Sequence, residues 1–120
     1  MAQQVRVLNA LIEEARITND DHGLLSSWLS LKLEGGFCQG FGGYALYLPQ
    51  SFTHHRLLSH AGHWIWRVME VAGARKWSEL KGKTIRVRKP DDFGPITAIG
   101  HIIDDDWFDP SVDFKTEKAA

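Results

Sequence analysis

The chain has 120 residues, of which 43% are hydrophobic and 24% are charged, and its formal net charge at pH 7 is -1. A chain of this length buries enough apolar surface for one hydrophobic core without disulfides or metals, so we expect a single domain over residues 1–120 with a polar C-terminal tail from about 111. The near-neutral charge argues against a general binder of duplex nucleic acid.

The sequence also argues against export and membrane insertion. Residues 1–8 lack the cationic and apolar regions of a signal peptide, and no segment reaches the roughly 18 apolar residues of a membrane span. The single cysteine, Cys38, has no partner within the chain for a disulfide, whereas small secreted domains usually use paired cysteines. We therefore expect a soluble protein of a reducing cytoplasm, with no membrane partner.

The N-terminal segment Val5–Ile17 fits two structures. Its apolar residues recur at helical spacing while its first residues alternate as in a strand, and the pattern alone slightly favours a helix. Asn19–Gly23 is dense in turn-forming residues and predicts a hairpin turn. Leu24–Leu33 then alternates, with leucines on one face and Trp28 among polar side chains on the other, which predicts a half-buried strand.

The middle of the chain predicts one short strand and one long helix. Tyr44–Leu48 is a strand candidate that Pro49 ends. Leu58–Ala72 has apolar residues at helical spacing, with Ser59 as a cap near its start and Gly73 as a stop signal after it.

The C-terminal part predicts shorter elements. Trp77–Leu80 predicts a single helical turn. Thr84–Lys89 alternates, with Arg86 and Arg88 facing outward, and Ile96–Ile103 is the expected last strand, followed by an irregular acidic segment. Together the elements predict an α+β fold in which a mainly antiparallel sheet packs against one long helix.

The segment Gly35–Gly43 is rich in glycine and has two interpretations. It is a wide hairpin loop, or it is a ligand-binding loop whose backbone N–H groups turn toward an anion. It matches neither a Walker loop nor a dinucleotide fingerprint. Its aromatic rings offer stacking faces for a base, and its glutamine offers a donor and an acceptor for a base edge. The candidate ligand residues of the segment are Gly35, Gly36, Phe37, Gln39 and Phe41.

The charges are distributed unevenly along the chain. Residues 75–89 are mostly basic and residues 91–113 are acidic, which indicates faces that pair with each other, a small anion site, or complementary surfaces in a homo-oligomer. Arg86 and Arg88 share one strand face about 7 Å apart, a spacing that brackets phosphate oxygens, although exposed strand arginines also serve solubility alone. Arg56 and Arg67 join this site only if the fold or a second subunit brings them near.

The histidines and the cysteine carry weaker signals. His60 and His63 lie three residues apart and follow His54 and His55, but no third ligand stands at a known metal-site spacing. Cys38 has no thiol-enzyme signature around it. We therefore expect no metal, no cofactor and no catalytic residue, and a protein that is not an enzyme.

Four groups of residues carry a resemblance that spans most of the chain. They are Asp20-Asp21-His22-Gly23; Gly35-Gly36 with Gln39-Gly40-Phe41-Gly42-Gly43-Tyr44; Gly82-Lys83-Thr84-Ile85-Arg86-Val87; and Ile99-Gly100-His101-Ile102-Ile103 with Asp106-Trp107-Phe108. Together they resemble a family of small bacteriophage and prophage proteins that includes the type-one Thoeris anti-defence sponge.

The resemblance implies a phage protein of the host cytoplasm that assembles as a dimer or a higher oligomer such as a hexamer. Such a protein binds a cyclic ADP-ribose isomer, and in some members cyclic trinucleotides at a separate site, and sequesters the signal without cleaving it. The resemblance also implies a strand at the N-terminus and a ligand held between an aromatic ring and an arginine, with the glycine segment, Arg56 and Arg86 as matching positions. Phe37 and Cys38 stand where smaller residues are expected, which argues against a tight backbone approach there.

A second function stays open on the residues alone. The tryptophans and the acidic C-terminal region suit a phage protein that inhibits a host nuclease or polymerase by direct contact, with its aspartates imitating the charge of nucleic acid. The basic strand and the aromatic glycine segment favour sequestration, whereas the aspartates favour the inhibitor.

We predict a homo-oligomer, because Trp28, Trp66 and Trp107 fall on faces that one small core does not need, and such apolar patches usually mark contacts. Sedimentation at micromolar concentration should give a multiple of the 13.6 kDa chain mass. A monomer at every such concentration would contradict this expectation.

Overall fold

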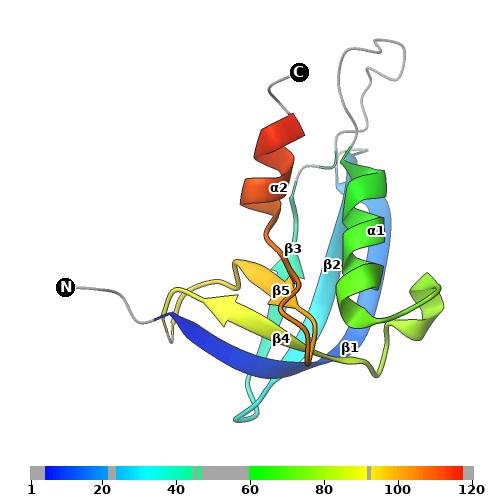
Figure 1. Cartoon of the computed structure of the whole chain (residues 1–120). Coiled ribbons are helices and arrows are strands. Elements are labelled where there is room, and N and C mark those ends of the chain that lie inside the picture. Colours follow the sequence, from blue (N-terminus) through cyan, green and yellow to red (C-terminus); the bar gives the residue numbers. More distant parts are fainter. Residues whose placement is uncertain (1–4, 22–23, 45, 47–59, 92, 118–120) are drawn as a thin grey trace, which may run out of the picture.

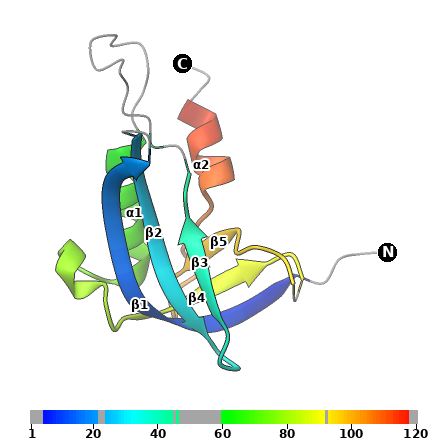
Figure 2. The same cartoon turned by 180° about the vertical axis from the view of Figure 1, so that it is seen from behind.

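The computed structural model describes residues 5–21, 24–44, 46, 60–91 and 93–117. Within them, six strands form one antiparallel sheet in the order β3-β2-β1-β4-β5-β6, and two helices lie on one side of it (Figures 1 and 2). The elements are β1 (Arg6–Asp21), β2 (Leu24–Leu33), β3 (Cys38–Gly42), α1 (Ala61–Ala72), a 3₁₀ turn (Trp77–Glu79), β4 (Thr84–Lys89), β5 (Ala98–Gly100), β6 (Trp107–Phe108) and α2 (Pro110–Glu117).

The longest strand, β1, lies at the centre of the sheet and bends sharply along its length (Figure 1). Its first half pairs with β4, from Arg6 opposite Lys89 to Leu11 opposite Thr84. Its second half pairs with β2, which lies on the other side of it. One strand therefore belongs to two differently oriented parts of the sheet.

The residue pattern of Val5–Ile17 slightly favoured a helix, and that prediction is wrong, because the segment forms most of strand β1. The β1–β2 register shifts between Ile12 and Glu14, which moves the inward side by one residue. Leu8, Ile12 and Ala15 all contribute to the core, at intervals of four and three. A strand with this irregularity imitates helical spacing, which explains the misleading pattern.

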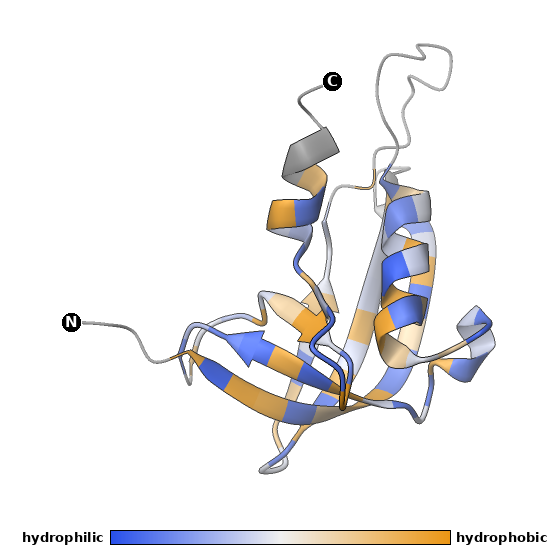
Figure 3. Ribbon diagram, viewed as in Figure 1, coloured by the Kyte–Doolittle hydropathy of each residue, from blue (hydrophilic) through white to orange (hydrophobic). Residues whose placement is uncertain are grey.

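The strands expected in Leu24–Leu33 and Thr84–Lys89 are confirmed with the faces that their alternation predicts. In β4, Ile85 and Val87 are buried while the arginines between and after them face outward. Orange and blue segments follow one another along β4, whereas β1 shows broader blocks of each colour (Figure 3). Asp21 pairs with Leu24, which confirms a β1–β2 hairpin, although residues 22–23 lie outside the described part.

Other strand boundaries differ from the expectation. Part of the glycine-rich segment is strand β3 rather than loop. Neither Tyr44 nor Leu46 belongs to a strand, and the rest of that candidate lies outside the described residues. The expected last strand shrinks to β5, because the chain turns after Gly100, and the acidic segment that follows contributes β6.

The described residues contain two helices, whereas the sequence predicted one long helix over Leu58–Ala72. The helix α1 begins at Ala61, whereas residues 58 and 59 lie outside the described part, and it ends at Gly73, which adopts a φ of 73° and donates its N–H to the last turn. The supposed polar tail is α2, where Asp109 accepts a hydrogen bond from the Ser111 N–H at 3.0 Å and Pro110 is the first helical residue.

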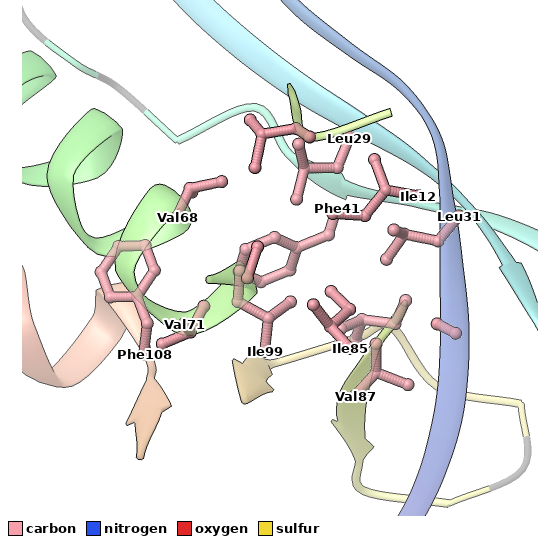
Figure 4. Packing of buried hydrophobic residues seen from close by; sticks show 14 of the residues in the cluster. Ile12, Leu29, Leu31, Phe41, Val68, Val71, Ile85, Val87, Ile99 and Phe108 are labelled. Atoms are coloured by element: carbon pink, nitrogen blue, oxygen red, sulfur yellow. The ribbon is translucent and has the colours of Figure 1, made fainter. Parts of the chain in front are cut away.

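The core lies between the sheet and α1. Rings and branched side chains from both meet there, with Phe41 from β3 stacked on Trp64 from α1 at a centroid distance of 5.4 Å. Figure 4 shows this packing, including Ile12, Leu29, Leu31, Val68, Val71, Ile85, Val87, Ile99 and Phe108. No helix in the described part of the chain is long and apolar enough to cross a membrane.

The neighbouring residues Leu11 and Ile12 provide a test of the β1 assignment. Ile12 is fully buried and Leu11 is 39% exposed. Ile12→Val should lower the free energy of unfolding by about 0.5–1.5 kcal/mol, whereas Leu11→Ala should change it by less than about 0.5 kcal/mol although it removes more atoms. Urea unfolding measures both, and equal losses would contradict the orientation of the strand.

Candidate functional site

The face of the sheet opposite the helices, called the outer face here, gathers polar side chains from three neighbouring strands. Directly paired residues of antiparallel strands project to the same face. Lys32, Leu11 and Thr84 therefore form one row across β2, β1 and β4. In the next row, Asn9 of β1 stands opposite Arg86 of β4.

The turn between β2 and β3 closes one end of this face. Gly35 and Gly36 adopt φ values of 97° and 94°, which side chains rarely tolerate, and the Leu33 N–H donates to the Phe37 carbonyl oxygen at 2.7 Å. The turn borders an open groove of about 340 Å³, a volume within the usual range of ligand sites. The groove is lined by Asn9, Ala10, Leu11, Lys32, Leu33, Glu34, Gly35, Gly36 and Thr84.

The two outward arginines of β4 stack on one indole ring. The guanidinium carbons of Arg86 and Arg88 lie 5.1 and 4.6 Å from the ring centroid of Trp107, which comes from β6. The ring lies against Gly100 of β5, where an added Cβ would stand only 2.6 Å from ring atoms. Glycine at this position is therefore what allows the stack to form.

Arg86 is also tied to the chain that follows β5. Its Nε donates to the carbonyl oxygen of His101 and one terminal nitrogen donates to that of Asp104, both at 2.7 Å. The side chain thus leans away from the groove and holds the β5–β6 connection. Among the described residues, none accepts a hydrogen bond from the Arg88 guanidinium, and Arg88 is partly exposed. Reversing the charge of Arg86 would therefore disturb the β5–β6 connection as well as any ligand contact.

Phe41 and Gln39 do not contribute to this site. Phe41 is 1% exposed within the core, so its ring has no free face for a base, and the expected stacking role is wrong. The Gln39 side chain accepts a hydrogen bond from Lys89 Nζ at 2.9 Å and donates one to the Gly94 carbonyl oxygen at 3.2 Å. Both ends of its amide are therefore used within the protein. Phe37 is 73% exposed and its ring lies near Gly35.

Arg67 lies on the helix side of the molecule, away from the outer face. Its guanidinium donates to Asp106 at 2.9 Å and to the Trp107 carbonyl oxygen at 2.7 Å, and it pairs with Glu70 on its own helix. Partial burial lowers its pKa, but the hydrogen bonds to Asp106 and Glu70 outweigh that effect, so the pKa of Arg67 is raised and its charge is permanent. The residue joins α1 to β6. Arg56, the remaining candidate, lies outside the described residues.

The second half of the glycine-rich segment serves packing. Trp28 of β2 lies over β3, where a Cβ on Gly40 would stand 3.1 Å from its ring and one on Gly43 only 2.4 Å. These glycines make room for an indole that remains 42% exposed. Among the described residues of the glycine-rich segment, only Gly35 and Gly36 border the groove.

The histidines take part in ring and ion-pair contacts. His60 stacks on Phe114 of α2 at 4.1 Å, and His63 Nε2 lies 2.9 Å from a carboxylate oxygen of Asp113. The described residues contain no group of three side chains suited to hold a metal ion. His54 and His55 lie outside the described part.

Of the candidate ligand residues, Gly35 and Gly36 border the groove, whereas Arg86 and Arg88 lie on the same face of the sheet but stack on Trp107. The sequence did not indicate Trp107 or the groove residues of β1 as part of this face. The sequence placed Trp107 and Gly100 in the same group of resembling residues, but it did not show that they touch. Their contact follows from the pairing of β5 with β6, in which Gly100 stands opposite Trp107. The sequence did not indicate that residues of β1 line the groove, because the pattern of Val5–Ile17 fitted both a helix and a strand.

Comparisons with protein-family models and with curated proteins find no match for this sequence.

The Gly100 contact predicts a specific loss. Gly100→Ala should lower the free energy of unfolding by about 1–3 kcal/mol, because the Trp107 ring must leave its place beside the arginines. Gly62→Ala is the matched control, since an added Cβ meets nothing within 4 Å on α1 and should raise stability by up to about 1 kcal/mol. Urea unfolding with near-UV circular dichroism measures both. Equal stabilities of the two variants would contradict the packing described.

Proposed function

We propose that this protein binds a cyclic nucleotide signal on the outer face of its sheet and sequesters it without cleavage, as a phage anti-defence protein in the cytoplasm of the host cell. The ligand class is a cyclic ADP-ribose isomer, with cyclic trinucleotides as further candidates. The protein acts by abundance and affinity rather than by turnover.

The proposal is carried by three cations on the same face of the sheet as the glycine turn. Lys32, Arg86 and Arg88 lie on one face of the sheet, and the backbone of Gly35–Gly36 borders the groove between the strands. Arg88 stacks on the Trp107 indole without a guanidinium hydrogen bond to a described residue, so its N–H edge is available for phosphate oxygens. A compact phosphorylated molecule suits this arrangement better than duplex DNA, because the chain as a whole carries a net charge of -1.

The groove chemistry supports binding without turnover. Among the residues that line it, Glu34 is the only carboxylate, and neither histidine nor cysteine is present. A ligand in the groove would thus meet one cation, Lys32, and one carboxylate, but neither the imidazole nor the thiol that most often performs acid–base or nucleophilic chemistry. We extend the proposal to a homo-oligomer of two or more chains, because Trp28 and Trp66 are 42% and 65% exposed.

A second candidate function rests on a different surface. Ile103 is 79% exposed and precedes the exposed carboxylates of Asp104 and Asp105 in the β5–β6 connection. An apolar side chain beside a pair of acids suits contact with a basic protein surface, as in an inhibitor of a host nuclease or polymerase.

Arg88 separates the two functions, because it is partly exposed on the outer face and its guanidinium contacts the Trp107 ring without a hydrogen bond to a described residue. Titration calorimetry with a cyclic ADP-ribose isomer and with a cyclic trinucleotide should show binding to the native protein. Arg88→Ala should weaken the affinity by about 10- to 100-fold, the effect of one charge-assisted hydrogen bond or two. Arg75→Ala is the matched control, since Arg75 is exposed and outside the outer-face site, and it should leave the affinity unchanged.

Chromatography of the bound fraction should return the ligand intact. Recovery of a hydrolysed product would refute sequestration, and the absence of heat with every such nucleotide would favour the protein-contact function instead.

A further inference from the structure

The groove beside the glycine turn contains one negatively charged group, which is unexpected in a site for phosphates. Its lining combines the apolar side chains of Ala10, Leu11 and Leu33 with polar groups, which include one cation, Lys32, besides Glu34. The Glu34 carboxylate repels a phosphate while the Lys32 ammonium attracts one, so the position beside Glu34 suits a neutral part of a phosphorylated ligand that carries hydrogen-bond donors. The cations Arg86 and Arg88 lean away from the groove toward Trp107, which leaves the phosphates a separate place.

The carboxylate is held in position by a reciprocal contact with β1. The backbone N–H of Asn9 donates to Glu34 Oε1 at 2.6 Å, and the backbone N–H of Glu34 donates to the Asn9 carbonyl oxygen at 2.9 Å. The contact exists because β2 ends at Leu33, opposite Ala10, so Asn9 has lost its strand partner on that side. One carboxylate oxygen thus completes the sheet edge, and among the described residues no group donates to the other, Oε2.

A fixed acceptor beside apolar side chains selects ligands that present hydrogen-bond donors. Carboxylates in nucleotide sites bind the hydroxyl groups of ribose in this way. We propose that the groove holds a ribose of the ligand, with the 2′-hydroxyl donating to Glu34 Oε2, so that the site selects ribonucleotides over 2′-deoxyribonucleotides. The inference rests on the proposed function, because it assigns the sugar of the same ligand. It also orients that ligand, with the sugar at Glu34 and the phosphates toward Arg88.

Glu34→Gln separates this role from the structural one. The glutamine oxygen still accepts the Asn9 N–H, so the sheet edge stays intact, while the group facing the groove changes from an acceptor to an NH₂ donor. Glu14→Gln is the matched control, since it removes one negative charge from β1 on the same face but away from the groove. Both variants should keep the thermal midpoint of the native protein.

The experiment compares ADP with 2′-deoxy-ADP, which have the same charge and the same base, by titration calorimetry on the full chain. The native protein and Glu14→Gln should bind ADP about tenfold more tightly than the deoxy compound, the effect of one hydrogen bond to a charged group. In Glu34→Gln this ratio should fall to about one.

Equal binding of the two nucleotides to the native protein would overturn the ribose assignment while leaving the proposed function in place. A ratio that persists in Glu34→Gln would also overturn it. If the native protein bound neither these nucleotides nor the cyclic ones, the proposed function would fall and this inference with it.

Discussion

The bend of β1 is the constraint on which the rest of the structure depends. The strand pairs with β4 before Ile12 and with β2 from Ala10 onward, and the register shift next to Ile12 lets it turn between the two parts of the sheet. On the inner side, this curvature wraps the sheet around α1 and closes the core. On the outer side, the groove forms along β1 between the end of β2 and the start of β4.

The two-residue strand β6 connects the outer face to the interior. Phe108 is fully buried among the rings of the core, and Trp107, next to it, carries the stacked arginines of β4 on the opposite face. Arg67 holds this strand from the helix side through the carbonyl oxygen of Trp107. The position of the arginine stack therefore depends on the packing of α1, and a change in the core near β6 is transmitted to the proposed phosphate contacts.

The arginines show how one residue type takes different roles in this fold. The Arg67 guanidinium donates hydrogen bonds to carboxylates and a carbonyl oxygen. Arg86 donates to two carbonyl oxygens and stacks on the indole of Trp107, whereas Arg88 contacts that indole alone. Of these three arginines, Arg88 is the one whose guanidinium contacts a ring but forms no hydrogen bond to a described residue. The proposed site thus depends on how far each guanidinium is already satisfied within the chain, rather than on the number of arginines.

The sequence by itself determined the features that depend on neighbours along the chain. Alternation in β2 and β4 predicted which side chains face the core, and Gly73 predicted the end of α1, because strand pleat and helix termination are local properties. Only the tertiary structure decided the inward turn of Phe41, the stack of Arg88 on Trp107 and the contact of Asn9 with Glu34. These depend on strand register and on an irregularity in β1, which are set by pairing between distant segments and leave no periodic trace in the sequence.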